Sequence, residues 1–330
     1  MTITLGVIGA GAWGTALAQM LASEGREVLL WAREDGLADA INSTRVNEPF
    51  LPTATLADSI TATGELSDME NCEIALVVTP AQHLGATLSG MKAFPRDLVL
   101  CSKGIEAATG RMMHDVAHSI APDSDIAVLS GPTFAHEVAA GLPTAVTLAC
   151  GGGEAQWERL VPALARREFR PYYADDLVGA EVGGAVKNVL AIGCGVVEGL
   201  KLGQNARNAL ITRGFAEMLR FGAALGGRPE TLNGLCGLGD LVLTCSSTSS
   251  RNFSLGKALG EGEDAATLMS DRRTVAEGAH TAPVLRELAL RHGVDMPITM
   301  AVNHLLEGAS AQDVARELLE RPLTSEDENL

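Results

Sequence analysis

The sequence has few basic residues, and its cysteines lack any paired spacing. It holds 25 Lys+Arg against 41 Asp+Glu, a net charge of -16 at pH 7. Binding to a nucleic-acid backbone rests on many Lys/Arg contacts, so the charge excludes nucleic acid as a broad partner but not a small phosphorylated ligand. Without a CxxC pair, the cysteines are typical of reduced, buried thiols in a cytosolic protein; they are Cys72, Cys101, Cys150, Cys194, Cys236 and Cys245.

Targeting, membrane and metal signals are also missing. The N-terminus has no charged segment followed by an apolar run, and no uninterrupted apolar stretch reaches the roughly 20 residues of a membrane span. We therefore expect no signal peptide, no membrane span and a cytoplasmic location. His114 and His118 are one helical turn apart but lack a third ligand, so we predict a solvated helix face and no metal site.

The first half of the chain alternates short apolar runs with helix-like segments. With 330 residues and 46% hydrophobic content, the chain suits two domains that each bury a core. Runs that are apolar on both faces fit central strands of a parallel sheet covered by helices. We predict strands at residues 3–8, 27–32, 73–78, 97–102 and 125–130, with 144–150 and the FRPYY segment as the last ones. This βαβ series indicates a doubly wound α/β domain of the Rossmann type.

The second half loses the strand signal after about Asp176. Its long segments have helical apolar spacing, and a glycine-rich helix from about Leu177 to Leu202 is expected to form its spine. We predict a dinucleotide-binding Rossmann domain over residues 1–178. An all-helical substrate-binding and catalytic domain over residues 179–330 follows it.

The segment GAGAWG, Gly9 to Gly14, is a G-x-G-x-x-G motif. It follows a predicted strand and opens a predicted helix, which is the context that gives the motif meaning. Gly9 allows the tight turn, and Gly11 lets the backbone approach a pyrophosphate at the helix N-terminus. The motif predicts dinucleotide binding through Gly9, Gly11, Ala12, Trp13 and Gly14.

The end of the second strand indicates which nicotinamide cofactor binds. An acidic residue there would accept from the ribose hydroxyls, whereas an arginine accommodates a 2′-phosphate. The chain reads LLWARED, with Arg33 nearest to that place. Arg33 favours NADPH, with NADH possible; the alternative is a surface arginine that answers Glu34.

Two lysines are candidates for proton transfer to a carbonyl. Lys103 directly follows the predicted strand that ends at Ser102, although it could be an ordinary loop lysine. Lys187 lies on an otherwise small and apolar helix, where burial would lower its pKa into the range of an acid/base catalyst. The alternative is that Lys187 reaches solvent along its stem. Asp240, on a glycine-flanked turn, could orient such a lysine or offset its charge.

Several motifs in order along the chain resemble the bacterial type of NAD(P)-dependent glycerol-3-phosphate dehydrogenase. They are GVIGAGAWGTALA, SKGIE, SGPTFAHEVAAGLPTA, GGAVKNVLAIGCGVVEGLKLGQNARNALITRG, GLGDLVLTCSSTSSRN and VAEG. The resemblance implies reversible reduction of dihydroxyacetone phosphate to sn-glycerol 3-phosphate, which supplies phospholipid synthesis. One departure is Ala12-Trp13, where the family often has Ser-Tyr or Ser-Trp, which removes one possible hydrogen bond to the pyrophosphate.

The resemblance also implies roles for individual residues. Lys187 matches the proton donor/acceptor, and Lys103 matches the lysine that touches both cofactor and substrate. Positions that match substrate contacts are Gly131, Thr133, Asp240, Thr244, Ser250, Arg251 and Asn252. Positions that match cofactor contacts are Ala135, Arg251, Val275 and Glu277. The Ser/Thr-rich stretch before Arg251 then becomes a helix-opening phosphate clamp, in which hydroxyls, free N–H groups and one guanidinium converge on a dianion.

Two other functions stay open from the residues alone. A β-hydroxyacid-type dehydrogenase would share the two halves and the lysine-asparagine helix, but its substrate would carry a carboxylate, which the Ser/Thr-Arg-Asn stretch disfavours. A nicotinamide-sensing regulator would not require Lys187, Lys103 and Asp240. Because the helical half is apolar, we also expect a homodimer.

Overall fold

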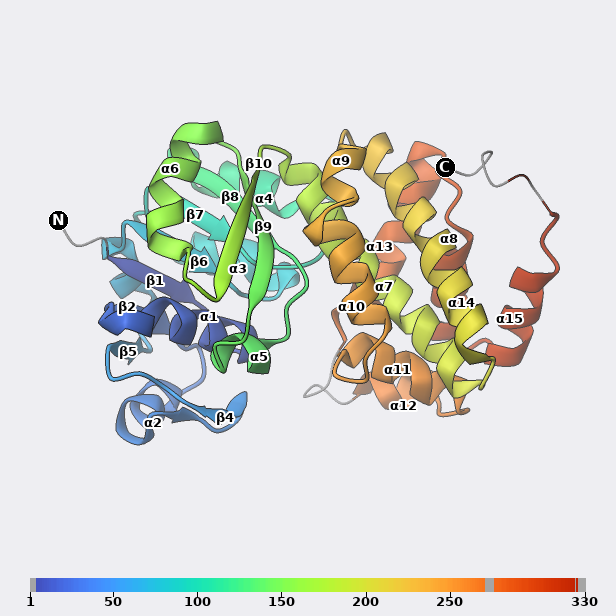
Figure 1. Ribbon diagram of the computed structural model, residues 1–330, viewed down its shortest axis with the longest axis horizontal. Coiled ribbons are helices and arrows are strands. Elements are labelled where there is room, and N and C mark those ends of the chain that lie inside the picture. Colours follow the sequence, from blue (N-terminus) through green and yellow to red (C-terminus); the bar gives the residue numbers. More distant parts are fainter. Residues whose placement is uncertain (1–3, 271–275, 324, 326–330) are drawn as a thin grey trace. The chain divides into compact units, whose positions relative to one another are not determined.

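The apolar runs of the first half form an eight-stranded sheet in the computed structural model, which describes residues 4–270, 276–323 and 325 (Figure 1). The strand order is β10-β9-β8-β7-β6-β1-β2-β5. The bounds are β1 Leu5–Ile8, β2 Val28–Trp31, β5 Ile60–Thr63, β6 Ile74–Val77, β7 Asp97–Leu100, β8 Asp125–Ser130, β9 Thr144–Cys150 and β10 Phe169–Ala174. The predicted doubly wound sheet is confirmed, with every predicted strand in place.

Strand direction changes once in this sheet. All neighbouring strands run parallel except β8 and β9, which pair antiparallel with Leu129 opposite Leu148. The link between β8 and β9 holds only the five-residue helix α5, Ala135–Ala139. Such a helix spans about 7.5 Å, too short to return along a strand of about 20 Å, so the chain re-enters the sheet in the opposite direction.

Helices cover both faces of the sheet. The helices of this part are α1 Ala12–Ala22, α2 Leu37–Thr44, α3 Ala81–Ser89, α4 Met113–Ile120, α5, and α6 Gly153–Leu164. One core joins α1, α5 and α6 to the same side of the strands, because residues alternate between the two faces of a strand. The helices α3 and α4 pack together, and α4 contacts β8.

A hairpin between α2 and β5 is absent from the sequence-based prediction. It pairs β3, Val46–Asn47, with β4, Leu51–Thr55, in antiparallel register. The strands are short and partly exposed, so they give no clear apolar pattern. The hairpin brings one buried asparagine, Asn47, next to the glycine loop, as described below.

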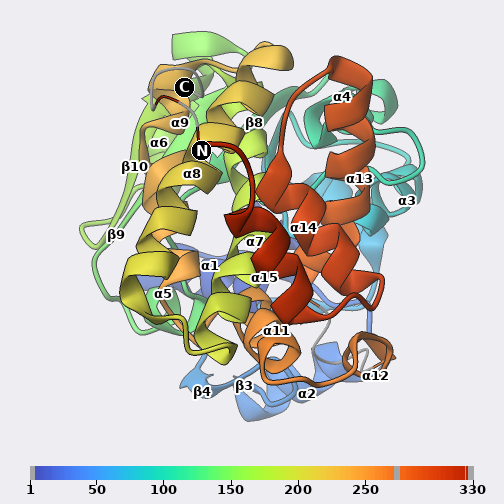
Figure 2. The ribbon, with the colours of Figure 1, turned by 90° about the vertical axis from the view of Figure 1, so that its right-hand side faces the viewer.

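The second part of the chain is helical in its described residues (Figure 2). Its helices are α7 Leu177–Gly199, α8 Gly203–Ala224, α9 Pro229–Leu232, α10 Asp240–Cys245, α11 Arg251–Gly260, α12 Ala265–Ser270, α13 Glu277–His292, α14 Pro297–Leu306 and α15 Ala311–Leu319. A π-helical turn, Leu235–Gly239, leads directly into α10. Such turns recur at functional sites.

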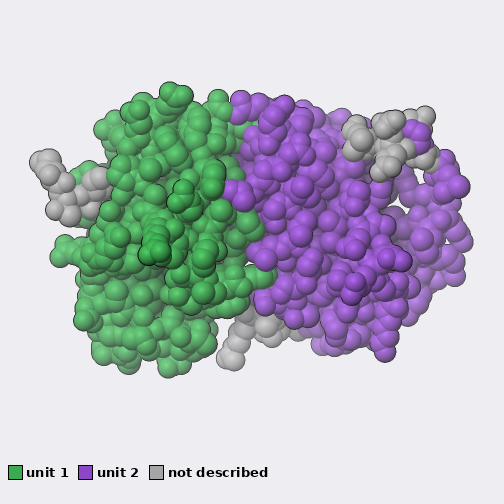
Figure 3. Space-filling model, in the orientation of Figure 1, with its two compact units in different colours: residues 1–102, 112–177 green, residues 103–111, 178–330 purple. Residues whose placement is uncertain are grey.

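The chain divides into two compact units, coloured green and purple in Figure 3. Unit 1 comprises residues 1–102 and 112–177, and unit 2 comprises residues 103–111 and 178–330. Residues 103–111, which a single boundary at 178 assigns to the first domain, therefore belong to the helical unit. They are held there by Lys103, which is bonded to Asp240, and by Gly110, which lies close to Leu288.

Helix α7 is buried along nearly its whole length and packs at backbone distance against the π-helical turn and α11. Its 23 residues are long and apolar enough to cross a membrane, but its apolar window is fully buried within the protein, as in the core helix of a soluble fold. Glycines allow the approach: a Cβ at Gly183 would lie 2.3 Å from the Cys236 carbonyl oxygen, and one at Gly195 would lie 2.0 Å from that of Phe253. The expected spine helix is thus present, and its glycines bring backbones into contact.

We predict that Gly195→Ala lowers the free energy of unfolding by about 1–3 kcal/mol or more, because the added methyl group meets fixed backbone. The matched control is Gly193→Ala on the same helix, where a Cβ meets nothing closer than 3.5 Å. The control should be neutral or stabilising by up to about 1 kcal/mol, because alanine favours a helix over glycine. Urea unfolding followed by circular dichroism measures both. Equal effects of the two substitutions would contradict the packing account.

Candidate active site

The glycine loop follows β1 and opens α1 in unit 1, as predicted. Gly9 has φ +118°, a conformation that residues with a Cβ rarely adopt. A Cβ at Gly14 would lie 1.8 Å from the Gly9 carbonyl oxygen, so the helix can start this close only with glycine there. A Cβ at Gly11 would meet nothing within 4 Å and would fill open space in front of the helix N-terminus.

This loop fits the pyrophosphate of a dinucleotide. The open space at Gly11 adjoins the first N–H groups of α1, which have no partner within the helix and attract anions. Trp13 is half-buried on the first turn, and its Nε1 has no hydrogen-bond partner among the described residues. The free backbone N–H groups at the start of α1 can therefore bind the pyrophosphate, although Ala12 lacks the hydroxyl of the serine that the family often has there.

Arg33 lies just beyond β2 and is exposed. Its guanidinium pairs with Glu34 at 3.5 Å, and both side chains are largely open to solvent. Exposed ion pairs of this kind contribute about 0–1 kcal/mol, so the pair would yield readily to a phosphate. The contact with Glu34 agrees with the alternative that Arg33 is a surface arginine. The guanidinium is also accessible to the 2′-phosphate of NADPH, as the predicted cofactor contact requires.

The turn after β8 holds three predicted contact positions. A Cβ at Gly131 would lie 2.9 Å from the Cα of Val146, so only glycine fits against the neighbouring strand. The Thr133 hydroxyl donates weakly to the Gly131 carbonyl at 3.4 Å, and Ala135 opens α5. All three lie at one turn, and their ligand contacts stay predictions.

In unit 2 the two candidate lysines meet at one buried carboxylate. Lys103 Nζ lies 2.8 Å from Asp240 Oδ2, and Lys187 Nζ donates to Asp240 Oδ1. Lys187 also donates to the Thr244 hydroxyl at 3.0 Å. The side chains are 15%, 6% and 0% exposed for Lys103, Lys187 and Asp240, so Lys187 does not reach solvent along its stem.

The two lysines differ in proton affinity. Burial, together with the charge of Lys103, lowers the pKa of Lys187 to about 7, although Asp240 opposes this change. Burial also acts to lower the pKa of Lys103, but the attraction and hydrogen bond of Asp240 outweigh it, so that pKa is raised. One lysine therefore keeps its charge at neutral pH, while the other can release and regain a proton.

Close backbone packing brings these groups together. Gly183, one turn before Lys187, lets the π-helical turn lie against α7, and Asp240 follows that turn at the start of α10. Thr244, one turn later on α10, reaches the same side and donates to Asp240 Oδ1 at 3.3 Å. The site thus depends on small residues that the sequence motif contains but that carry no chemistry themselves.

The Ser/Thr-rich stretch leads into a helix, as predicted. The Ser250 hydroxyl accepts from Phe253 N at 3.3 Å and caps α11, which begins at Arg251. The Arg251 side chain is exposed, at a helix start that favours anions. The Asn252 amide is used internally: Nδ2 donates to Asn188 Oδ1, and Oδ1 accepts from Gly278 N, both at 2.9 Å.

That chain of bonds includes Asn188, which the sequence analysis did not single out. Asn188 directly follows Lys187 and donates to the Gly184 carbonyl at 3.2 Å. It ties α7 to α11 and, through Asn252, to the start of α13. The sequence signal that could have identified Asn188 is its position directly after Lys187.

Glu277 opens α13, and burial raises its pKa against the opposing charges of Arg251, Lys103 and Lys187. Val275 lies outside the described residues.

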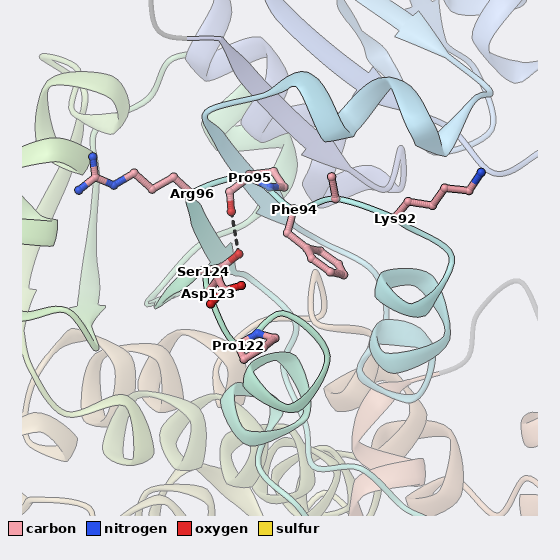
Figure 4. Close-up of a pocket in the computed structure, with 8 residues that line it drawn as sticks. Lys92, Phe94, Pro95, Arg96, Pro122, Asp123 and Ser124 are labelled. Atoms are coloured by element: carbon pink, nitrogen blue, oxygen red, sulfur yellow. Dashed lines mark hydrogen bonds between the residues drawn. The ribbon is translucent and has the colours of Figure 1, made fainter.

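A surface pocket in unit 1 is unrelated to these groups (Figure 4). It is lined by Lys92, Ala93, Phe94, Pro95, Arg96, Pro122, Asp123 and Ser124. Its residues precede β7 and β8, so the pocket lies at the amino ends of these parallel strands. The glycine loop follows β1 and therefore lies at the opposite, carboxyl ends of the strands. Lys92 and Arg96 extend away from one another, and Ser124 is bonded to the Pro95 carbonyl at 2.7 Å. The pocket has no convergent polar groups.

Comparison with known proteins establishes the family. The models for the N-terminus and the C-terminus of NAD-dependent glycerol-3-phosphate dehydrogenase match residues 4–156 and 176–316. A protein named glycerol-3-phosphate dehydrogenase [NAD(P)+] from Erythrobacter litoralis is 68% identical over 329 residues, which cover 100% of this chain and 99% of that protein. The chain belongs to the glycerol-3-phosphate dehydrogenase family.

Further members agree in sequence and fold. A relative of the same name from Novosphingobium aromaticivorans is 69% identical over 327 residues, 99% of each chain. The crystal structure of glycerol-3-phosphate dehydrogenase from Coxiella burnetii is 39% identical and superposes with a TM-score of 0.91 over 97% of this chain and 99% of that one. The resemblance read from the motifs and the fold class are thus confirmed.

We predict that Gly11→Val in this family member weakens NADPH binding by about 100-fold or more, because the side chain fills the space next to the free N–H groups. Folding should be unaffected, since valine accepts φ −69° and its Cβ meets nothing within 4 Å. Gly14→Ala is the contrasting variant, expected to lose stability because its Cβ meets the Gly9 oxygen. Calorimetric titration and thermal melting measure both, and unchanged NADPH affinity in Gly11→Val would contradict the assignment.

Proposed function

We propose that the protein catalyses the reversible NAD(P)H-dependent reduction of dihydroxyacetone phosphate to sn-glycerol 3-phosphate. The observation that carries this proposal is the buried pair of lysines on one carboxylate, in which Lys187 has a pKa of about 7. A carbonyl reduction needs a proton donor poised near neutral pH, and Lys187 meets that requirement. The family relatives bear the name of this activity.

The chemistry divides between the cofactor and the residues of unit 2. When bound, the nicotinamide supplies the hydride that C2 of the substrate receives. Lys187 gives the proton at Nζ to the oxygen on C2, and it takes that proton back in the reverse direction. Asp240 and Thr244 fix the direction of Nζ, because each occupies one hydrogen-bonding position of the amine.

Lys103 has a different role because Asp240 keeps it protonated. Its positive charge stabilises the negative charge that develops on the substrate oxygen and attracts the phosphorylated substrate. Dihydroxyacetone phosphate carries a dianionic phosphate group, and the N-terminus of α11 attracts such a group. We infer that its phosphate binds Arg251 and the α11 N-terminus capped by Ser250, with Asn252 holding this turn in place. Gly131 and Thr133 are the further proposed substrate contacts.

For the cofactor, the glycine loop and Trp13 would hold the pyrophosphate, and Arg33 the adenosine end. Arg33 favours NADPH, and NADH is the second nicotinamide that the relatives' names admit. The remaining proposed cofactor contacts are Lys103, Ala135, Arg251, Val275 and Glu277. We also propose a cytoplasmic homodimer that supplies phospholipid synthesis.

Replacing Lys187 by methionine tests this function most simply. We expect Lys187→Met to lower kcat for reduction by about 1000-fold, because the proton donor is lost, while NADPH affinity changes little. The matched control is Lys257→Met on α11, where the half-exposed lysine pairs with the neighbouring surface residue Glu261. Loss of NADPH absorbance on addition of dihydroxyacetone phosphate measures turnover. Retained activity in Lys187→Met would remove Lys187 from the mechanism.

The two directions of the reaction should depend on pH in opposite ways. Reduction needs Lys187 protonated, so its rate should be constant below a pH of about 7 and fall about tenfold per unit above it. Oxidation needs the neutral amine, so its rate should rise with pH up to that point. In Asp240→Asn the inflection should move to lower pH, because the carboxylate that raises the pKa is gone. An inflection that stays above 10 in the unmodified protein would contradict the assignment.

A further inference from the structure

The unpredicted β3–β4 hairpin places one asparagine under the glycine loop. Asn47 is fully buried, and its Nδ2 donates to the Ala10 carbonyl at 2.8 Å and to the Thr15 hydroxyl at 2.7 Å. The Thr15 hydroxyl in turn donates weakly to the same carbonyl at 3.4 Å. Ala10 lies within the G-x-G-x-x-G motif, and Thr15 lies on the first turns of α1.

The orientation of this amide is fixed by its partners. The Ala10 carbonyl can only accept a hydrogen bond, so the NH₂ end of Asn47 must face it. The other end, Oδ1, is buried and has no hydrogen-bond partner among the described residues. Leaving an acceptor unpaired costs stability, and an apolar residue would avoid that cost. We infer that an asparagine occupies this position because its Nδ2 group donates to the Ala10 carbonyl.

The donor sets the direction of the neighbouring N–H group. The Ala10–Gly11 peptide is planar and trans, because the described chain has no cis peptide bond. In a trans peptide the C=O and the N–H point in opposite directions. Holding the Ala10 oxygen against Asn47 therefore turns the Gly11 N–H away from the interior. Gly11 itself has open space beside it, because a Cβ there would meet nothing within 4 Å.

We propose that Asn47 is a positioning residue for the cofactor: it clamps the Ala10 carbonyl and thereby aims the Gly11 N–H at the cofactor pyrophosphate. This inference rests on the proposed use of the glycine loop for cofactor binding. Asn47 does not touch the pyrophosphate itself in this account. Its effect on the cofactor passes through one peptide plane, with Thr15 as second support.

The test replaces Asn47 by aspartate, which has the same shape but presents an oxygen to the Ala10 carbonyl. We expect Asn47→Asp to raise KM and Kd for NADPH about tenfold or more, because a misaligned donor forfeits a charge-assisted bond. Its kcat at saturating NADPH and its KM for dihydroxyacetone phosphate should change less than about threefold. The matched control is Asn42→Asp on α2, an asparagine that bonds the Ala62 backbone away from the loop; it should leave all three constants unchanged.

A purely structural role would give a different result. It would lower kcat by reducing the folded fraction while leaving KM for NADPH unchanged, and that outcome overturns the proposal. If Asn47→Asp does not fold, Thr15→Val decides instead: a raised KM for NADPH that Thr15→Ser restores supports the clamp, and an unchanged KM overturns it. The variant Gly11→Val distinguishes a failure of the glycine-loop proposal from a failure of the Asn47 proposal. If that variant binds NADPH normally, the glycine-loop proposal fails; if it does not bind and Asn47→Asp does, only the clamp fails.

Discussion

A single carboxylate, that of Asp240, holds the proposed catalytic chemistry together. It is inaccessible to solvent, and it accepts hydrogen bonds from two lysines that would be expensive to bury without it. Because one negative charge serves two ammonium groups, the lysines cannot both be fully compensated. The outcome is an unequal pair, in which Lys103 stays charged and Lys187 gives up its proton near neutral pH. Removing Asp240 would lower the pKa of Lys187 further, because burial and the charge of Lys103 would then act unopposed by the carboxylate.

The rest of unit 2 can be understood as the scaffold for that contact. Gly183 and Gly195 let α7 meet the π-helical turn and α11 at backbone distance, and this closeness brings Asp240 to Lys187. The Asn188–Asn252–Gly278 bonds then tie the starts of α11 and α13 to the same helix. Unit 1 uses a parallel device, in which Asn47 fixes a glycine loop through a carbonyl. In both units the side-chain amide of an asparagine holds backbone in place beside a group proposed to act on the ligand.

Much of this follows from the sequence, and the remainder has physical reasons. Central strands are apolar on both faces and bounded by turns, so their positions can be predicted within a few residues, and motif context identifies the glycine loop and Lys187. The antiparallel turn of β9 could not be predicted, because the apolar pattern of a strand carries no direction. The β3–β4 hairpin is short and half-exposed, which hides Asn47. The placement of residues 103–111 with the helical unit depends on the distant partners Asp240 and Leu288, which local spacing does not reveal.

The central claim is that Asp240 divides proton affinity unequally between Lys187 and Lys103, and nuclear magnetic resonance can observe it directly. Protein labelled with ¹³C at the lysine Cε positions would be titrated with pH, with Lys187→Met and Lys103→Met used to assign the two signals. The account predicts that the Lys187 signal titrates near pH 7 and that the Lys103 signal titrates above the usual range of a lysine. Two signals that titrate together above pH 10 would contradict it.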